Sequence, residues 1–132
     1  MDNWLRVMLA LVAAAHGVGH LLFLLSLLGV AEWGQPSRSW LLGDAWLAKG
    51  LGSLIWLVAT AGFIAVAVGI FNESAWWRSL AIISSVTSCL GLFLFWVNPT
   101  TSPAVSALIF NLLVLGSLIV LHWPPSLEAS GS

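Results

Sequence analysis

The sequence predicts an all-α integral membrane protein, an antiparallel up-down bundle of four transmembrane helices with one interfacial loop between the first two. The 132 residues are 60% hydrophobic and only 7% charged, whereas soluble domains have about a quarter of their residues charged. Four segments stay apolar for about 20 residues, the length that crosses a hydrocarbon core of about 30 Å as a helix. Except for Trp56, the nine tryptophans fall at or near the predicted helix ends, where the indole ring prefers the membrane interface.

Residues 1–125 form one predicted domain, and its four spans are 4–28, 44–71, 75–97 and 102–123. Residue types that begin or end helices mark the boundaries. The starts are marked by Asp44, Ser74 and Ser102-Pro103, and the ends by Gly29, Asn98-Pro99 and Pro124-Pro125. Short connections after the second and third spans predict that neighbouring helices run antiparallel. The tail, 126–132, reads as a linker left by cloning and is excluded from the domain.

The first loop, 30–43, mixes charged residues with tryptophan and leucine. This mixture suits a segment lying in the headgroup layer, and it would also suit a lid over one end of the bundle. The two sides of the membrane carry equal numbers of basic residues, Arg6 and Arg78 against Arg38 and Lys49. Because Lys49 falls inside a helix, we expect both termini on the cytoplasmic side of the cell inner (plasma) membrane, with dual insertion left open.

His16 and His20 are the strongly polar, titratable side chains that lie well inside a predicted span. Their i, i+4 spacing puts both on one helix face. A rise of 1.5 Å per residue places His16 near the midplane, and the other spans have polar residues at a similar depth, namely Thr60, Thr87 or Ser88, and Asn111. Exposure of such groups to lipid would cost several kcal/mol, so we expect this polar layer to face the bundle interior.

The polar layer predicts a pocket for a small or lipophilic ligand, such as a lipid, a quinone or a sterol entering from the bilayer. The candidate ligand-binding residues are those of the layer and of the second-span stripe that faces it: His16, His20, Lys49, Trp56, Thr60, Ser88 and Asn111. The alternative is a structural or accessory membrane subunit without a ligand. In that protein the polar layer would only fix helix packing, through interhelical hydrogen bonds of about 0.6–2 kcal/mol each.

A further alternative is a histidine-based metal or haem site. His16 and His20, with Cys89 at a similar depth, would favour zinc or copper, but no glutamate lies between the histidines, so the zinc-protease motif does not apply. Haem would need a single axial histidine or a dimer, because His122 is about 15 Å from His16 in depth. Apart from Asp44 at the first position of the second span, the spans contain no carboxylate to drive proton-coupled export, although a histidine could carry the proton instead. Nothing fixes a substrate beside either histidine. The sequence therefore favours a non-enzyme without a cofactor.

The net charge and the cysteine content exclude one class of partner and one kind of covalent bond. A net charge of −1 provides no basic surface, so nucleic acid is not an expected partner. The single Cys89 excludes an intrachain disulfide. The expected partners are membrane lipids and a lipophilic small molecule, and the composition is also compatible with a homo-oligomer.

Two stretches resemble known small membrane proteins. One stretch resembles the first helix of DoxX-like four-helix membrane proteins, in which an arginine near the helix start precedes a His-Gly pair. It consists of Leu5-Arg6-Val7-Met8 followed by Ala15-His16-Gly17-Val18-Gly19-His20-Leu21. A second stretch resembles uncharacterised bacterial four-span proteins. It runs from Trp76-Trp77-Arg78 through Ser88-Cys89 and Phe95-Trp96 to Asn111. The specific part of the resemblance covers the first helix, and the rest is mainly topology. It implies a four-helix membrane fold and indicates no particular activity.

Overall fold

The computed structural model describes residues 1–31, 36–96 and 101–124. It contains helices α1 (Asn3–Leu27), α2 (Trp46–Phe71), α3 (Trp77–Leu94) and α4 (Ser102–Leu115), and a π-helical turn, η1 (Gly116–Val120), continues α4. In this part of the chain the β-structure is a single bridge between Ser39 and Gly43. All four helices, with η1 counted into the last, are long and apolar enough to cross a membrane. The prediction of an all-helical fold with four span-length helices is confirmed.

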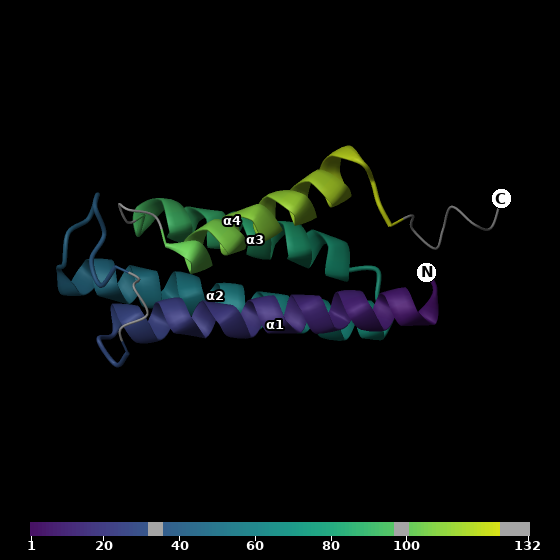
Figure 1. Cartoon of the computed structure of the whole chain (residues 1–132), viewed down its shortest axis with the longest axis horizontal. Helices are drawn as coiled ribbons and strands as arrows, with labels where there is room; N and C mark the ends of the chain where they lie inside the picture. Colours follow the sequence, from purple (N-terminus) through teal and green to yellow (C-terminus); the bar gives the residue numbers. More distant parts are fainter. Residues whose placement is uncertain (32–35, 97–100, 125–132) are drawn as a thin grey trace.

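Helices that follow one another in the chain pack side by side, α1 on α2, α2 on α3 and α3 on α4. The pair α1 and α2 and the pair α3 and α4 form two layers (Figure 1). Buried apolar side chains form two clusters. Each contains residues of α1, α2 and α3 and of either α4 or its continuation η1. One cluster contains Phe23, Leu24, Leu27, Ile55, Trp56, Leu92, Leu94, Phe95, Ala104 and Ala107. The other contains Ala10, Ala13, Val66, Ala67, Ile70, Ala81 and Leu118. On every helix, the buried polar residues of the predicted layer lie between the positions given to these two clusters.

Three of the four predicted helix starts, 4, 44 and 75, differ from the observed ones, and the fourth, 102, agrees. The N-cap residues are Asp2, Ala45, Trp76 and Thr101, and none of these described starts has a side-chain cap. The backbone N–H of Ser74 closes the end of α2, donating to the Gly69 carbonyl at 2.9 Å, and α3 begins three residues later at Trp77. Asp44 follows the tight turn closed by the Ser39 and Gly43 bridge, and α2 starts after it. Pro103 does lie in the first turn of α4, as expected for proline.

The helix ends agree with the sequence at α1 and depart from it at α4. Gly29 adopts a left-handed φ of +70°, and the bonds from Gly29 N to Ser26 O and from Val30 N to Leu25 O complete a Schellman motif. The predicted regular helix to Trp123 instead changes to a π-helix at Gly116, whose carbonyl accepts from Leu121 N at 3.1 Å. Helix α3 ends at Leu94, three residues before the predicted end of the third span at 97. Residue 97 itself, the loop residues 32–35 and the tail 126–132 lie outside the described residues.

The described part of the first loop binds the end of α3. The Ser39 hydroxyl donates to the Leu94 carbonyl at 2.5 Å, and the Trp40 indole N–H donates to the Phe93 carbonyl at 2.6 Å. The last carbonyls of a helix have no partner within it, so these two side chains supply the missing donors. The loop is thereby attached to the same end of the bundle as the cluster around Trp56.

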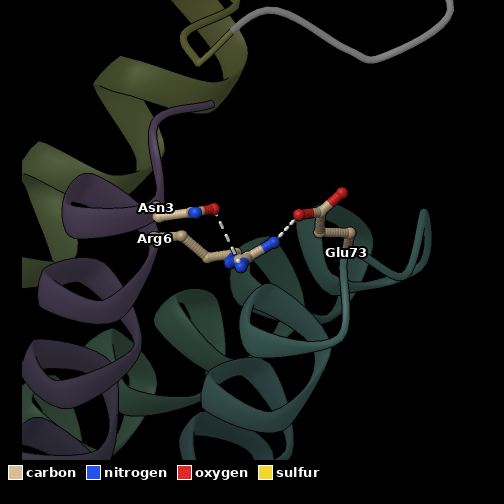
Figure 2. A network of polar contacts seen from close by, with 3 residues as sticks. All are labelled: Asn3, Arg6 and Glu73. Atoms are coloured by element: carbon tan, nitrogen blue, oxygen red, sulfur yellow. Dashed lines mark hydrogen bonds and ion pairs between the residues drawn. The ribbon is translucent and has the colours of Figure 1, made fainter.

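At the opposite end, Arg6 of α1 connects to the turn between α2 and α3. Its guanidinium donates to Asn3 Oδ1 at 3.1 Å and forms an ion pair with Glu73 (Figure 2). Glu73 has a φ of +56°, the left-handed conformation that glycine normally takes after a helix. The carboxylate is therefore presented to Arg6 from a strained backbone position.

Candidate functional site

The polar site is built beside a close contact between α1 and α2. A Cβ placed on Gly17 would lie 3.0 Å from the Phe63 Cβ and 3.1 Å from the Thr60 carbonyl oxygen. A side chain larger than hydrogen would therefore push the two helices apart. This contact fixes the adjacent turn of α1, which carries His16 on one side of Gly17 and His20 one turn later, against the ring of Phe63.

Four side chains from three helices form one hydrogen-bonded network. His16 Nε2 lies 3.1 Å from Asn111 Oδ1, and Asn111 Nδ2 donates to Ser88 Oγ at 2.7 Å. Ser88 Oγ lies 2.6 Å from His20 Nε2, and His20 Nδ1 lies 2.9 Å from the carbonyl oxygen of His16. His20, Ser88 and Asn111 are fully buried. The network begins at the side chain of His16 and ends at its backbone.

The protons of this network can be placed in one way when both imidazoles are neutral. A carbonyl oxygen only accepts, so His20 Nδ1 donates to His16 O, and His20 Nε2 is left as an acceptor. Ser88 must then give its proton to His20 Nε2 and accept from Asn111 Nδ2. Asn111 Oδ1 therefore accepts from His16 Nε2–H. Each hydrogen bond of the network then has one donor and one acceptor, and His16 Nδ1 is the one ring nitrogen left over.

His16 Nδ1 has no partner in the described part of the chain. The nitrogen is also absent from the buried, unsatisfied side-chain atoms of that part, and His16 itself is half-buried, so this lone pair is accessible. Its ring is held between aromatic faces, stacked on Phe110 with centroids 3.9 Å apart and edge-on to Phe63 at 4.6 Å. The ring is thus fixed by one hydrogen bond and two aromatic contacts, with its second nitrogen open.

The open nitrogen belongs to a residue that lines a groove between α1 and α4. This groove, called here the His16 groove, has a volume of about 360 Å³. Its residues are Val12, Ala15, His16, Gly19, His20, Leu22, Phe23, Pro103, Ser106, Ala107 and Phe110. A second groove of about 320 Å³ is lined almost wholly by apolar side chains from all four helices and shares Val12 and Phe110 with the first. Both volumes are in the range of small-molecule sites.

The remaining candidate residues are placed differently. Trp56 is buried and stacked on Phe23 with centroids 4.7 Å apart, and it lines neither groove. Thr60 is buried, and its hydroxyl has no partner in the described chain. Lys49 is exposed near the start of α2, outside the network. Cys89 is half-buried, and the described residues contain no group of three histidine, cysteine or acidic side chains that could hold a metal.

Two residues of the site were not among the sequence candidates. Phe63 contacts both histidine rings, and Phe110 stacks on His16. Phe63 could have been found, because it follows Trp56 by seven residues and Thr60 by three and so shares their helix face. Phe110 precedes Asn111 directly, and neighbours in a helix do not share a face, so the pattern gave no signal for it.

The chain was also compared with known proteins. Comparison with protein-family models, curated proteins and solved structures finds no match. The site must therefore be understood from its own geometry.

Proposed function

We propose that this chain crosses a membrane as an up-down antiparallel four-helix bundle and binds a lipophilic small molecule in the His16 groove. The topology is supported by the order of the two apolar clusters along each helix. Residues of the Trp56 cluster come late in α1 and α3 but early in α2 and α4, and the order of the other cluster is reversed. Contacts of this kind favour a bundle in which consecutive helices run in opposite directions.

Membrane insertion is supported by the outward faces of the helices. Each helix exposes large apolar side chains along its length, among them Leu11, Leu57, Val86 and Leu112. Soluble monomers do not leave apolar patches of this extent in water. A bilayer removes that cost, and helices satisfy their own backbone groups there. We place the chain in the cell inner membrane with both termini cytoplasmic, and we infer from the first helix that it is related to the DoxX-like proteins.

The accessible Nδ1 of His16 is the observation that carries the binding proposal. Buried polar groups are normally hydrogen-bonded, and in this network both ring nitrogens of His20 are bonded whereas His16, which lines the groove, has one ring nitrogen left open. Apolar walls with one well-placed polar group are typical of small-molecule sites. The groove is lined by α1 and α4 alone, so a molecule dissolved in the bilayer would enter between these two helices.

A purely structural role is the second candidate, and a specific observation favours it for three of the four residues. His20, Ser88 and Asn111 are fully buried, and each makes two hydrogen bonds within the network. They need no ligand and hold α1, α3 and α4 in register. His16 differs because it takes part in the same network and still faces the groove.

Two glycines provide a variant that fills the groove and a matched control away from it. A Cβ on Gly19, which lines the groove, or on Gly50, which does not, would meet no atom within 4 Å. Gly19→Leu therefore places a side chain into the His16 groove, and Gly50→Leu makes the same change on α2 away from it. Both replace a glycine inside a helix, so neither should lower stability.

The experiment compares the molecules that each protein retains. Wild type, Gly19→Leu and Gly50→Leu are purified in mild detergent, exchanged into fresh detergent, and extracted for mass spectrometry. We expect wild type and Gly50→Leu to retain one lipophile at a fixed ratio to protein, and Gly19→Leu to lose it. Equal retention by all three variants would contradict binding in this groove, and retention by none would favour the structural role.

A further inference from the structure

His16 and Ser106, the polar side chains of the groove lining that have a hydrogen-bonding atom left over, share one property, which is that this atom is an acceptor. His16 Nδ1 is unprotonated because the ring proton is on Nε2, where Asn111 Oδ1 accepts it. Ser106 is the other polar side chain besides the histidines in this lining. Its hydroxyl proton is given to the Pro103 carbonyl at 3.0 Å, which leaves its oxygen as an acceptor. Both ring nitrogens of His20 are already bonded within the network.

The groove offers neither charges nor backbone donors. None of its lining residues, all of which are in the described chain, is an acid, a lysine or an arginine. Pro103, the lining residue from the first turn of α4, has no N–H. The other lining residues lie farther inside α1 and α4, where helical hydrogen bonds occupy the amides. An anionic headgroup would therefore find no donor here, and a cation would find no carboxylate.

We propose that the ligand of the His16 groove is a neutral lipophile that donates a hydrogen bond to His16 Nδ1, namely an alcohol or a phenol. This inference rests on the proposed binding function and adds the chemical class of the ligand. A molecule whose polar atoms only accept, such as an ether, ester or ketone, would bring two lone pairs together at His16. It would leave the lone pair of that nitrogen desolvated and unmatched, which is the costly arrangement for a polar group in an apolar site.

Two molecules of the same length separate the donor from the hydrocarbon. Decan-1-ol has one hydroxyl proton, and 1-methoxydecane replaces it with a methyl group. The full chain, labelled with ¹⁵N-histidine and held in lipid nanodiscs, is titrated with each compound while the nitrogen resonances of His16 are followed. His20 and His122 serve as internal references, and Gly19→Leu serves as the variant with a filled groove.

We expect His16 Nδ1 to give an unprotonated-nitrogen signal in the free protein and to move towards the protonated position as decan-1-ol binds. The ether should bind about tenfold more weakly, the loss expected for one hydrogen bond. Gly19→Leu should remove the response to both compounds. His16→Phe, which keeps a ring but removes the acceptor, should abolish the preference for the alcohol.

The possible failures are distinguishable. Equal affinities of wild type for the alcohol and the ether, both lost in Gly19→Leu, would overturn the donor requirement and leave the proposed binding function standing. Saturable binding of neither compound to wild type would overturn both. A protonated His16 Nδ1 in the free protein would also overturn the donor requirement, whichever compound binds.

Discussion

Helix α1 packs against α2 and faces α4 over the same stretch of sequence, but it does so by different means. Towards α2 the contact is made by backbone, because Gly17 brings α1 to within van der Waals distance of the Thr60 carbonyl and the Phe63 Cβ. Towards α4 the contact is made by side chains, through the His16 to Asn111 hydrogen bond and the His16 to Phe110 stack. Both grooves have residues of α1 and α4 in their walls.

The difference shows how a small bundle can be rigid and still leave room for a ligand. A helix pair in backbone contact has no space to open, so the α1 and α2 pair forms a fixed support for the rings of His16 and Phe63. A pair bridged by side chains can keep a groove on either side of the bridge. The bridge itself must then be held in place, and the buried network of Ser88, His20 and Asn111 does this from behind.

The strongest test of the comparison is the same substitution two residues apart on α1. Gly17→Leu would drive a side chain into the backbone of α2, and we expect the free energy of unfolding to fall by about 3 kcal/mol. Gly19→Leu points into open space and should leave stability unchanged or raise it by up to about 1 kcal/mol. Unfolding by sodium dodecyl sulfate in mixed micelles, followed by tryptophan fluorescence, measures both. Similar losses for the two variants would mean that α1 packs equally closely on both sides.

A smaller effect tests whether the network holds the side-chain bridge. Ser88→Ala would leave His20 Nε2 without a donor and Asn111 Nδ2 without an acceptor, and we expect a loss of about 1–3 kcal/mol. Ser85→Ala is the matched control on the same helix, because Ser85 is equally buried but its hydroxyl has no partner in the described chain. Removing that hydroxyl should be neutral or slightly stabilising. The same unfolding assay applies, and an equal response to the two substitutions would argue that the network does not support the bridge.

The side of α1 that packs on α2 and the side that faces α4 were not equally predictable from sequence. The polar layer could be found because 1.5 Å per residue fixes depth, and it correctly grouped His16, Ser88 and Asn111. Helical periodicity also put Trp56 and Thr60 inside. Lys49 has the same periodicity but lies near the helix start and is exposed, since a long charged side chain can extend away from apolar surroundings there.

What the sequence could not provide is the separation of α1 and α4. That separation depends on the packing of every helix between them, so no local pattern encodes the groove or the stacking of Phe110 on His16. The direction of the hydrogen bonds was hidden for a related reason. It follows from His20 Nδ1 facing a backbone carbonyl one turn earlier, a contact that depends on the side-chain rotamer rather than on residue type.

The smallest expected effect concerns the end of the α1 and α2 pair, where Arg6 of α1 forms an ion pair with Glu73, which follows α2. The left-handed φ of +56° at Glu73 destabilises the fold by about 1 kcal/mol. An ion pair this exposed stabilises it by about 0–1 kcal/mol. Glu73→Gln keeps the strain and loses the charge, so we expect a loss of up to about 1 kcal/mol. Glu73→Gly loses the ion pair but relieves the strain, so it should stay within about 0.5 kcal/mol of wild type. Unfolding in the same micelles at low and high salt measures both. If glutamine proves no less stable than glycine at either salt concentration, strain at this turn does not oppose the ion pair, and the end of the α1 and α2 contact depends on packing alone.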